Sequence, residues 1–357
     1  MPTLLKFLIR RLFAIPVTLL IITATLYGIL MLAPVEVRAQ LYMPRGSSNN
    51  PNLRPEVLLQ QIIESHGLDD PYPVQYLRWL GRLLQGDWGW SAGFRFDVLP
   101  ALLQRTPATA ELTFYAVVLL IPLGIIGGGL AGAKEHRAVD HAFRVVAFVA
   151  TAIPPFVLAL VLLGIFYAGL HWFPPGRLTA GEEFVVANAE FTTYTGLLTL
   201  DGLLNHRSDI SLSALRHLVL PCITLSMVHW ATLGRMTRAM MIEEMHKDYV
   251  TVARGKGLKE RLVIWRHALH NAMIPALNSI ALSTASLIMG VFVVEAIFDY
   301  PGVSELIVSS SVLGAPDTAA AMGFAVYSVL LVLPVMLILD ILQAVFDPRL
   351  RDELAAQ

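Results

Sequence analysis

The sequence contains very little of what soluble enzymes use for chemistry. Only 15% of its 357 residues are charged, and the single cysteine, Cys222, excludes an internal disulfide or a cluster of thiolate ligands. The chain has no G-x-x-x-x-G-K-[ST] segment, so it has no P-loop for nucleotide phosphates. It also has no H-E-x-x-H segment, a common zinc-protease signature. We therefore expect a protein without a catalytic site, which itself binds no metal and no cofactor.

Apolar residues, by contrast, are abundant. They make up 55% of the chain, and the mean hydropathy is +0.62, values outside the usual range of soluble enzymes. The basic residues gather in separate loops rather than on one continuous face, so a nucleic-acid partner is not expected. Six apolar stretches reach the ~20 residues that a bilayer core requires. We predict an all-α integral membrane protein with six transmembrane helices, at residues 8–33, 108–133, 145–170, 216–238, 276–298 and 320–346.

The distribution of lysine and arginine predicts the orientation in the membrane. Most basic residues fall on one side if that side holds both termini and the connections 134–144 and 239–275, whereas the connection 299–318 has no Lys or Arg. Both termini are therefore predicted to be cytoplasmic. The prediction divides the chain into an N-terminal tail with the first transmembrane helix (1–33), an extracytoplasmic segment with short helices (34–107) and a core domain with five transmembrane helices (108–357).

The extracytoplasmic segment is expected to have its own structure. Pro55 suits a first helical turn and Gly67 a helix end, which predicts one short helix. A second is predicted from Tyr72 to Gln85. This segment is better explained as a lid, or as a part that packs against the outer end of the bundle, than as a separate ligand-binding site.

Candidate pathway or gate residues lie near the ends or breaks of spans: Glu111, Pro154, Pro155 and Glu295. Thr106 as cap and Pro107 in the first turn predict that the second helix begins there, so Glu111 has a capping role besides a possible contact with substrate. The two adjacent prolines must break or kink the third span. A glutamate near the outer end of a span costs free energy unless its carboxylate contacts water or a polar partner. Glu295 therefore either lines a pathway or holds the following turn.

Two further features concern packing and charge. The glycines Gly124, Gly127 to Gly129 and Gly132 are predicted to let neighbouring helices approach closely. The outer loop from His171 to Leu215 carries several carboxylates against few bases. It either helps to receive a cationic or zwitterionic ligand or is a solvated acidic loop, and the second interpretation is the simpler one.

Residues 248 to 275 form a polar, basic stretch between two apolar ones, yet the stretch has helical periodicity. Leu262, Trp265 and Leu269 recur at spacings of three and four. Gly255 and Gly257 indicate either a break between two short helices or a place where another backbone comes close. We interpret this stretch as a docking element on the cytoplasmic side.

This stretch contains the patterns A-R-x-K-G-L, from Ala253 to Leu258, and R-H-A-L-x-N-A-x-x-P, from Arg266 to Pro275. In these patterns the sequence resembles the coupling loop of ABC-importer permeases, and it is closest to the B-type subunits of the dipeptide, oligopeptide and nickel branch. Thr251 and Val252 replace the glutamate and first alanine of the wider family's signature. Similar family patterns occur at Gly67 to Leu80, at Arg105 to Glu111 and at Asp340 to Arg349, whereas 314–323 departs from the pattern. The resemblance marks these coupling residues: Ala253, Arg254, Lys256, Gly257, Leu258, Arg266, His267 and Asn271.

The resemblance implies a type I ABC-importer permease in the inner membrane of a prokaryote. The implied partners are a homologous C-type permease, two ATPase subunits that use ATP and magnesium, an extracytoplasmic substrate-binding protein and membrane lipid. ATP-driven closure of the ATPases would move the coupling helix and reorient the bundle, with close approach at Ala253 and Gly257. The cargo stays open among dipeptides, longer peptides, nickel chelates, haem and glutathione.

The alternative is an ion- or proton-driven secondary transporter, in which residues 248–275 are an ordinary basic loop. Such transporters place carboxylates at mid-bilayer depth, whereas Glu111, Glu295 and Asp340 all lie toward span ends. His267 and His270 are one turn apart but have no third ligand at helical spacing, so a metal site is not expected.

Overall fold

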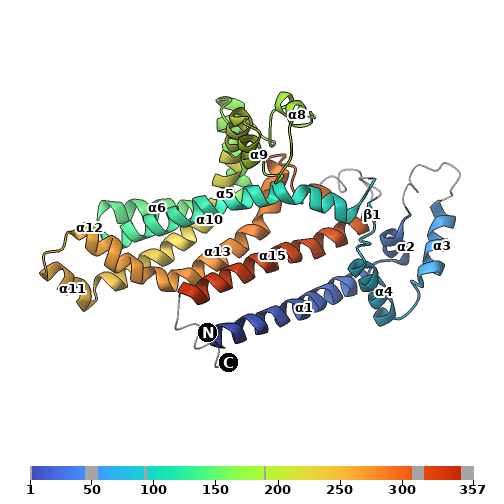
Figure 1. Cartoon of the computed structure of the whole chain (residues 1–357), viewed down its shortest axis with the longest axis horizontal. Helices are drawn as coiled ribbons and strands as arrows, with labels where there is room; N and C mark the ends of the chain where they lie inside the picture. Colours follow the sequence, from blue (N-terminus) through green and yellow to red (C-terminus); the bar gives the residue numbers. More distant parts are fainter. Residues whose placement is uncertain (1, 45–54, 92–94, 189, 308–316, 347–357) are drawn as a thin grey trace.

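The computed structural model of the chain describes residues 2–44, 55–91, 95–188, 190–307 and 317–346. It is a mostly helical structure in which long helices lie side by side in an elongated bundle (Figure 1). The single sheet of the described residues is a two-stranded antiparallel ribbon that pairs Trp90 with Asp97. The five long helices are α1 (Pro2–Leu30), α5 (Val98–Ala133), α10 (Ser208–Met245), α13 (Leu269–Ile297) and α15 (Thr318–Phe346).

Four of the described helices are long and apolar enough to cross a membrane, and a bent pair makes a fifth candidate. The apolar part identified in α13 is the shorter stretch Leu282–Ile297, within the fifth expected region 276–298. The described residues therefore hold four or five candidate spans. Six spans, and the side on which the termini lie, stay predictions.

The predicted break of the third span at the two prolines is confirmed. Helix α6 (Ala138–Ala152) and helix α7 (Pro155–Leu162) meet at 100°, and α7 continues as a π-helix, η3 (Leu163–Gly169). Pro155 occupies the first turn of α7, where a missing backbone N–H costs nothing. Helix α6 begins inside the expected loop 134–144, so the helical region starts earlier than predicted.

The predicted start of the second long helix at Thr106 was wrong. Helix α5 begins at Val98, and Thr106 lies inside it, with its hydroxyl donating to the Leu102 carbonyl at 2.8 Å. Pro107 is also interior and removes one backbone hydrogen bond from the helix. Glu111 is consequently a buried interior residue rather than part of a cap.

The described residues of the segment 34–107 form short helices, as predicted. Pro55 opens the third helix and Gly67, with φ of +58°, follows its end. The elements of this segment are α2 (Val35–Ala39), the 3₁₀ turn η1 (Gln40–Tyr42), α3 (Pro55–His66), α4 (Tyr72–Leu84), β1 (Trp90–Ser91) and β2 (Phe96–Asp97).

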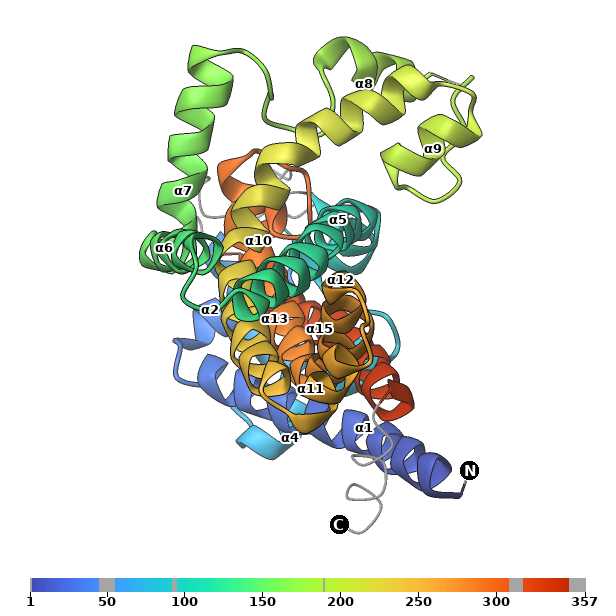
Figure 2. The ribbon, with the colours of Figure 1, turned by 90° about the vertical axis from the view of Figure 1, so that its left-hand side faces the viewer.

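The remaining short helices lie in the two long connections of the bundle. Helices α8 (Ala180–Val186) and α9 (Leu198–Leu204) precede α10 and project from the side of the bundle together with α7 (Figures 1 and 2). The connection from α10 to α13 holds α11 (Asp248–Gly255), α12 (Glu260–Leu262) and the π-helix η4 (Val263–Ala268).

Close packing of α5 on α10 organises the core. A Cβ atom added to Gly128 would overlap the carbonyl oxygen of Gly234, and one added to Gly132 would lie 2.7 Å from the carbonyl oxygen of Arg238. Only glycine permits backbones to approach so closely. The prediction that this run of glycines brings helices together is confirmed, and the contact lies within this chain.

This packing predicts different effects for adjacent glycines. Gly128→Ala should destabilise the protein by about 1–3 kcal/mol, because the methyl group meets rigid backbone on α10. Gly127→Ala is the matched control, since its Cβ would make an ordinary 3.5 Å contact with Phe143. Thermal unfolding of the two variants in the same detergent measures the difference. Equal melting temperatures would contradict the proposed close approach.

Candidate functional site

The connection between α10 and α13 is anchored in the chain's own core. Val250 is fully buried and Ala253 is 7% exposed, and both belong to the apolar cluster that joins α5, α10 and α13. The expected close approach of a partner at Ala253 does not match this position, because its methyl group packs inside the chain. Helix α11 is therefore fixed to the bundle on one side and open on the other.

Of the two interpretations of Gly255 and Gly257, the structure shows the break, which separates α11 from α12. Gly257 has φ of +73°, its N–H donates to the Arg254 carbonyl, and the N–H of Leu258 donates to the Ala253 carbonyl. These two bonds are those of a Schellman motif, which requires a left-handed residue. Among the described residues, apart from its two chain neighbours, no atom lies within 4 Å of a Cβ added to Gly257. Its backbone conformation, and not internal packing, calls for glycine here.

An ion pair bridges the break. The Arg254 guanidinium donates to both carboxylate oxygens of Glu260, at 2.7 and 3.2 Å. This bond lowers the pKa of Glu260 below its ordinary value. Both side chains are about half exposed, so the pair sets the geometry of the turn more than it adds stability.

The open side of the connection is apolar and hollowed. Val252, Leu262 and Trp265 are 54%, 38% and 37% exposed, although they lie outside the candidate spans. Leu262 and Trp265 line a hollow of about 560 Å³ beside Gly257. We call Val252, Leu258, Leu262 and Trp265 the α11 surface. It is at the near end of the bundle in Figure 2, where α11 and α12 face the viewer.

The other predicted residues of this loop lie around that surface. Lys256 and Arg266 are exposed, whereas His267 and Asn271 are partly buried where η4 leads into α13. Burial and the Glu244 carboxylate raise the pKa of Tyr249, and a hydrogen bond with Asn271 opposes that shift. The described residues contain no group of three or more potential metal ligands.

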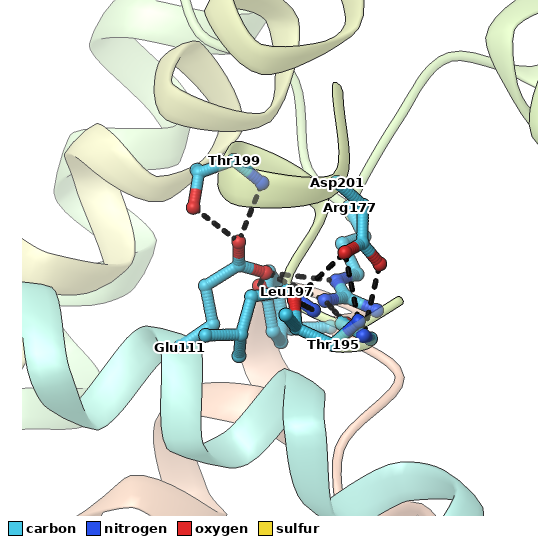
Figure 3. Close-up of polar contacts among 8 residues, drawn as sticks. Glu111, Arg177, Thr195, Leu197, Thr199 and Asp201 are labelled. Atoms are coloured by element: carbon cyan, nitrogen blue, oxygen red, sulfur yellow. Dashed lines mark hydrogen bonds and ion pairs between the residues drawn. The ribbon is translucent and has the colours of Figure 1, made fainter. Parts of the chain in front are cut away.

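A second set of residues forms a buried polar network near the projecting helices. Glu111 is 1% exposed, and its carboxylate accepts hydrogen bonds from the Arg177 guanidinium at 2.6 Å and from the backbone and hydroxyl of Thr199 at 2.8 and 2.7 Å. Tyr300 also donates to it at 3.3 Å. Figure 3 shows Glu111 on α5 pointing toward Thr199 and Arg177. The network joins α5, the α7–α8 loop, α9 and the turn after α13.

Asp201 continues this network and corrects the interpretation of the outer loop as merely solvated. Its side chain is fully buried and accepts hydrogen bonds from the backbone and hydroxyl of Thr195 and from the backbone of Gly196 (Figure 3). Arg177 donates to the Gly196 carbonyl at 2.6 Å. The acidic composition of the loop thus includes a structural carboxylate, which composition does not distinguish from the exposed ones.

Glu295 holds the turn that follows α13. Its carboxylate accepts hydrogen bonds from the backbone and hydroxyl of Ser304 at 3.0 and 2.6 Å and from the Thr109 hydroxyl at 2.5 Å. A side chain at Gly302 would overlap this carboxylate. Of the two roles considered for Glu295, these contacts favour the turn. Its role in lining a pathway stays a prediction.

The structure brings Glu111 and Glu295 to opposite sides of one polar region but leaves Pro154 and Pro155 at the separate α6–α7 break. A pocket of about 360 Å³ lies beside this region and is lined by Arg177, Glu183, Glu295, Asp299 and Glu305 among others. Carboxylates outnumber cations among these five side chains. The arrangement suits a solute group that is positively charged or zwitterionic.

Two features had no predicted role. Asp140, fully buried on α6, accepts hydrogen bonds from the Arg238 guanidinium on α10 at 2.5 and 2.8 Å, which ties these helices together near the α11 end. Gly89 to Gly93 spell G-x-S-x-G, a pattern of serine hydrolases. Ser91, however, is fully buried in β1 and donates to the Asp317 carboxylate at 2.5 Å. This serine is part of the packing of α15 on β1.

The spans, the broken helix and the anchored helical connection define a multi-pass membrane permease subunit. The chain belongs to the family of binding-protein-dependent transport system inner membrane components, and the match to this family covers residues 121–352. The N-terminal region of binding-protein-dependent transport system membrane components matches residues 4–113. The predicted family is thereby confirmed, and the chain is an inner-membrane component of a binding-protein-dependent importer.

Curated relatives match over most of their length. The chain is 33% identical over 346 residues to the oligopeptide transport system permease protein AppB of Bacillus subtilis (strain 168), covering 96% of this chain and 98% of the relative. It is 34% identical to the probable D,D-dipeptide transport system permease protein DdpB of Escherichia coli (strain K12), over 83% and 85%. It is 30% identical to the oligopeptide transport system permease protein OppB of Escherichia coli (strain K12), over 97% and 99%.

The buried ion pair predicts a loss that a second substitution partly reverses. Arg177→Met should destabilise the protein by about 3 kcal/mol, because it leaves the Glu111 carboxylate buried without its cation. Adding Glu111→Gln to that variant should recover part of the loss, since the amide is neutral and still accepts from Thr199. Thermal unfolding of the two single variants and the double variant gives the coupling. Additive losses would show that the two side chains do not act as a pair.

The Arg254–Glu260 ion pair across the α11–α12 break predicts that the local stability of this connection depends on pH. Because the pKa of Glu260 is lowered in the folded state, its contribution is complete above the unfolded-state value and is lost as the pH falls through the folded value. The protection of the amides of residues 248–262 from hydrogen exchange, corrected for the intrinsic rate, should therefore be lower at acid pH than at neutral pH. Glu260→Gln is the control and should show raised exchange at both pH values. An unchanged pH response in that variant would assign the effect to another group.

Proposed function

We propose that this chain is a permease subunit of an ATP-binding-cassette importer that moves peptides or a related small solute across the inner membrane. The observation that carries the proposal is the α11 surface, a group of accessible apolar side chains on α11 and on the turn and helices that follow it, while the other side of α11 is buried in the bundle core. Exposed apolar patches outside the lipid suit a protein partner. An ATPase subunit is the partner we propose there.

In the proposed mechanism the ATPase moves α11, and the bundle follows. Val250 and Ala253 are packed into the core that also contains α5, α10 and α13, so α11 cannot shift independently of these helices. The Schellman turn at Gly257 and the Arg254–Glu260 bridge keep the connection from yielding locally. At the other end, Glu111 and Glu295 link α5 to the turn after α13. A displacement at one end is thereby passed to the other.

The wider assembly belongs to the same proposal. The pore would contain six spans from this chain with both termini cytoplasmic, paired with a homologous C-type permease. Two ATPase subunits would use ATP and magnesium, and an extracytoplasmic binding protein would deliver the solute. This chain would bind no cofactor and catalyse no reaction. The permease class of the chain supports these partners.

The proposal of a peptide cargo has two supports. The relatives named above are oligopeptide and dipeptide permeases. The pocket beside Arg177, Glu183 and Asp299 has an excess of carboxylates near a guanidinium, which suits the two opposite charges of a zwitterion. An uptake assay with a nickel chelate, haem and glutathione beside peptides would show whether one of these is the cargo instead.

The gradient-driven alternative is less well supported. A coupling carboxylate must exchange an ion, whereas Glu111 and Glu295 are each occupied by several hydrogen bonds. Membership of an importer family that depends on a binding protein also opposes it. Uptake that persists after the ion gradients are dissipated, with ATP maintained, would support the ATP-driven mechanism.

The decisive test is a charge placed on the α11 surface. Val252→Asp should reduce both co-purification of ATPase subunits and ATP-dependent peptide uptake at least about tenfold, because a loss of 1.4 kcal/mol in docking suffices and an unpaired charge costs more in an apolar interface. Val57→Asp on α3 is the matched control, since that valine is also helical and 46% exposed, but α3 and α11 lie at opposite ends of the molecule (Figure 1).

Each outcome of this test separates two parts of the proposal. Retained ATPase binding and uptake in Val252→Asp would remove the α11 surface from the docking site. Normal co-purification of ATPases with the unsubstituted chain, but no uptake of any peptide, would reject the cargo while keeping the importer class.

A further inference from the structure

Helix α4 presents an apolar stripe away from the part of the chain on which it packs. Val74, Leu77 and Leu84 are 40%, 64% and 80% exposed. Their spacing of three and seven residues places them on one face of the helix. The opposite face holds Gln75 and Trp79, which are 1% and 6% exposed. The helix thus exposes an apolar stripe on the side opposite its packed face.

The contacts of α4 fix its depth relative to α1. The Tyr72 hydroxyl donates to the Ala24 carbonyl at 2.7 Å, and the Tyr76 hydroxyl lies 3.0 Å from the Thr23 hydroxyl. The apolar span of α1 extends to Leu30. At 1.5 Å per residue, Ala24 lies about 9 Å before that end of the span. The tyrosines of α4 therefore reach the level of the span itself.

The direction of α4 agrees with a position in the membrane interface. Figure 1 shows α4 crossing the end of α1 that is far from the N-terminus, rather than continuing along it. Helices that lie in the interface bury an apolar face about 5–10 Å deep, and tyrosines are enriched at that level. The Tyr72 hydroxyl, which contacts Ala24, lies at a depth in this range, and the Tyr76 hydroxyl, which lies 3.3 Å from the Leu20 carbonyl, reaches deeper.

The charged groups of α4 are paired with carboxylates of neighbouring residues. Arg78 pairs with Asp70 at 2.6 Å, and Arg82 pairs with Asp87 at 2.7 Å. Arg78 adjoins Leu77 at the edge of the stripe, so its side chain can extend to the headgroups while the leucine enters the acyl region. These ion pairs hold charge beside the stripe without placing it on the stripe.

We propose that α4 is an interfacial membrane anchor whose Val74–Leu77–Leu84 face lies in the outer headgroup and acyl boundary of the bilayer. The occupant of this face is lipid, because the exposed apolar surface of α1, including Leu20 and Ile29, continues to the same level. The anchor fixes the depth and tilt of α1, and through it the position of the outer segment over the bundle.

The test uses nitroxide labels on the full chain in vesicles of phosphatidylethanolamine and phosphatidylglycerol. Leu77→Cys and Leu84→Cys carry the label in turn, and Cys222 is retained because it is 5% exposed, with the unsubstituted chain as blank. At both positions, collisions with oxygen should exceed those with a water-soluble nickel chelate several-fold. Glu64→Cys on α3 is the control, an exposed polar position that should show the reverse ratio.

Three results would overturn the anchor. Greater collision with the nickel chelate at Leu77→Cys and Leu84→Cys would place the stripe in water. Protection from both reagents would place it against protein, such as a second permease subunit. An oxygen-dominated ratio at Glu64→Cys as well would show that the immersion is not specific to the stripe. Both leucines are exposed, so their replacement leaves the core intact, and Val74→Cys provides a third position.

Discussion

The close approach of α5 and α10 is the constraint on which the rest of the structure depends. At Gly128 the backbone of one helix meets the backbone of the other, and no larger residue fits there. The remaining core forms around this pair, with α13 and the buried side of α11 packed against it. A membrane bundle gains little from the hydrophobic effect between helices, so dense contact of this kind supplies much of its cohesion.

Polar interactions then connect the two ends of this core in different ways. Near the projecting helices, Glu111 and Glu295 are fully engaged by donors from other elements, which makes that end a rigid network. Near α11, Asp140 and Arg238 tie α6 to α10. Buried charges are costly unless paired, and each of these carboxylates has its compensating donors. The bundle is therefore suited to move as a unit.

Much of the local structure was predictable because it depends on neighbouring residues. The break at Pro154 and Pro155 follows from missing donors and ring sterics, and the helix ends at Gly67 and Gly257 follow from left-handed backbone conformations. The start of α5 was not predictable in this way. Thr106 and Pro107 form a good helix start locally, but Val98 and Ala101 pack in an apolar cluster that includes Tyr27 and Tyr327, and this packing extends the helix past them.

The sequence by itself determined the class of protein, since apolar length, glycine spacing and the motif around Gly257 all depend on order along the chain. Only the tertiary structure decided which groups are partners. Glu111 lies 66 residues from Arg177 and 88 from Thr199, so no spacing rule connects them. Likewise, Ala253 and Val252 are adjacent, yet one is buried and the other exposed. Burial depends on the bundle against which the helix packs, and local sequence does not contain that information.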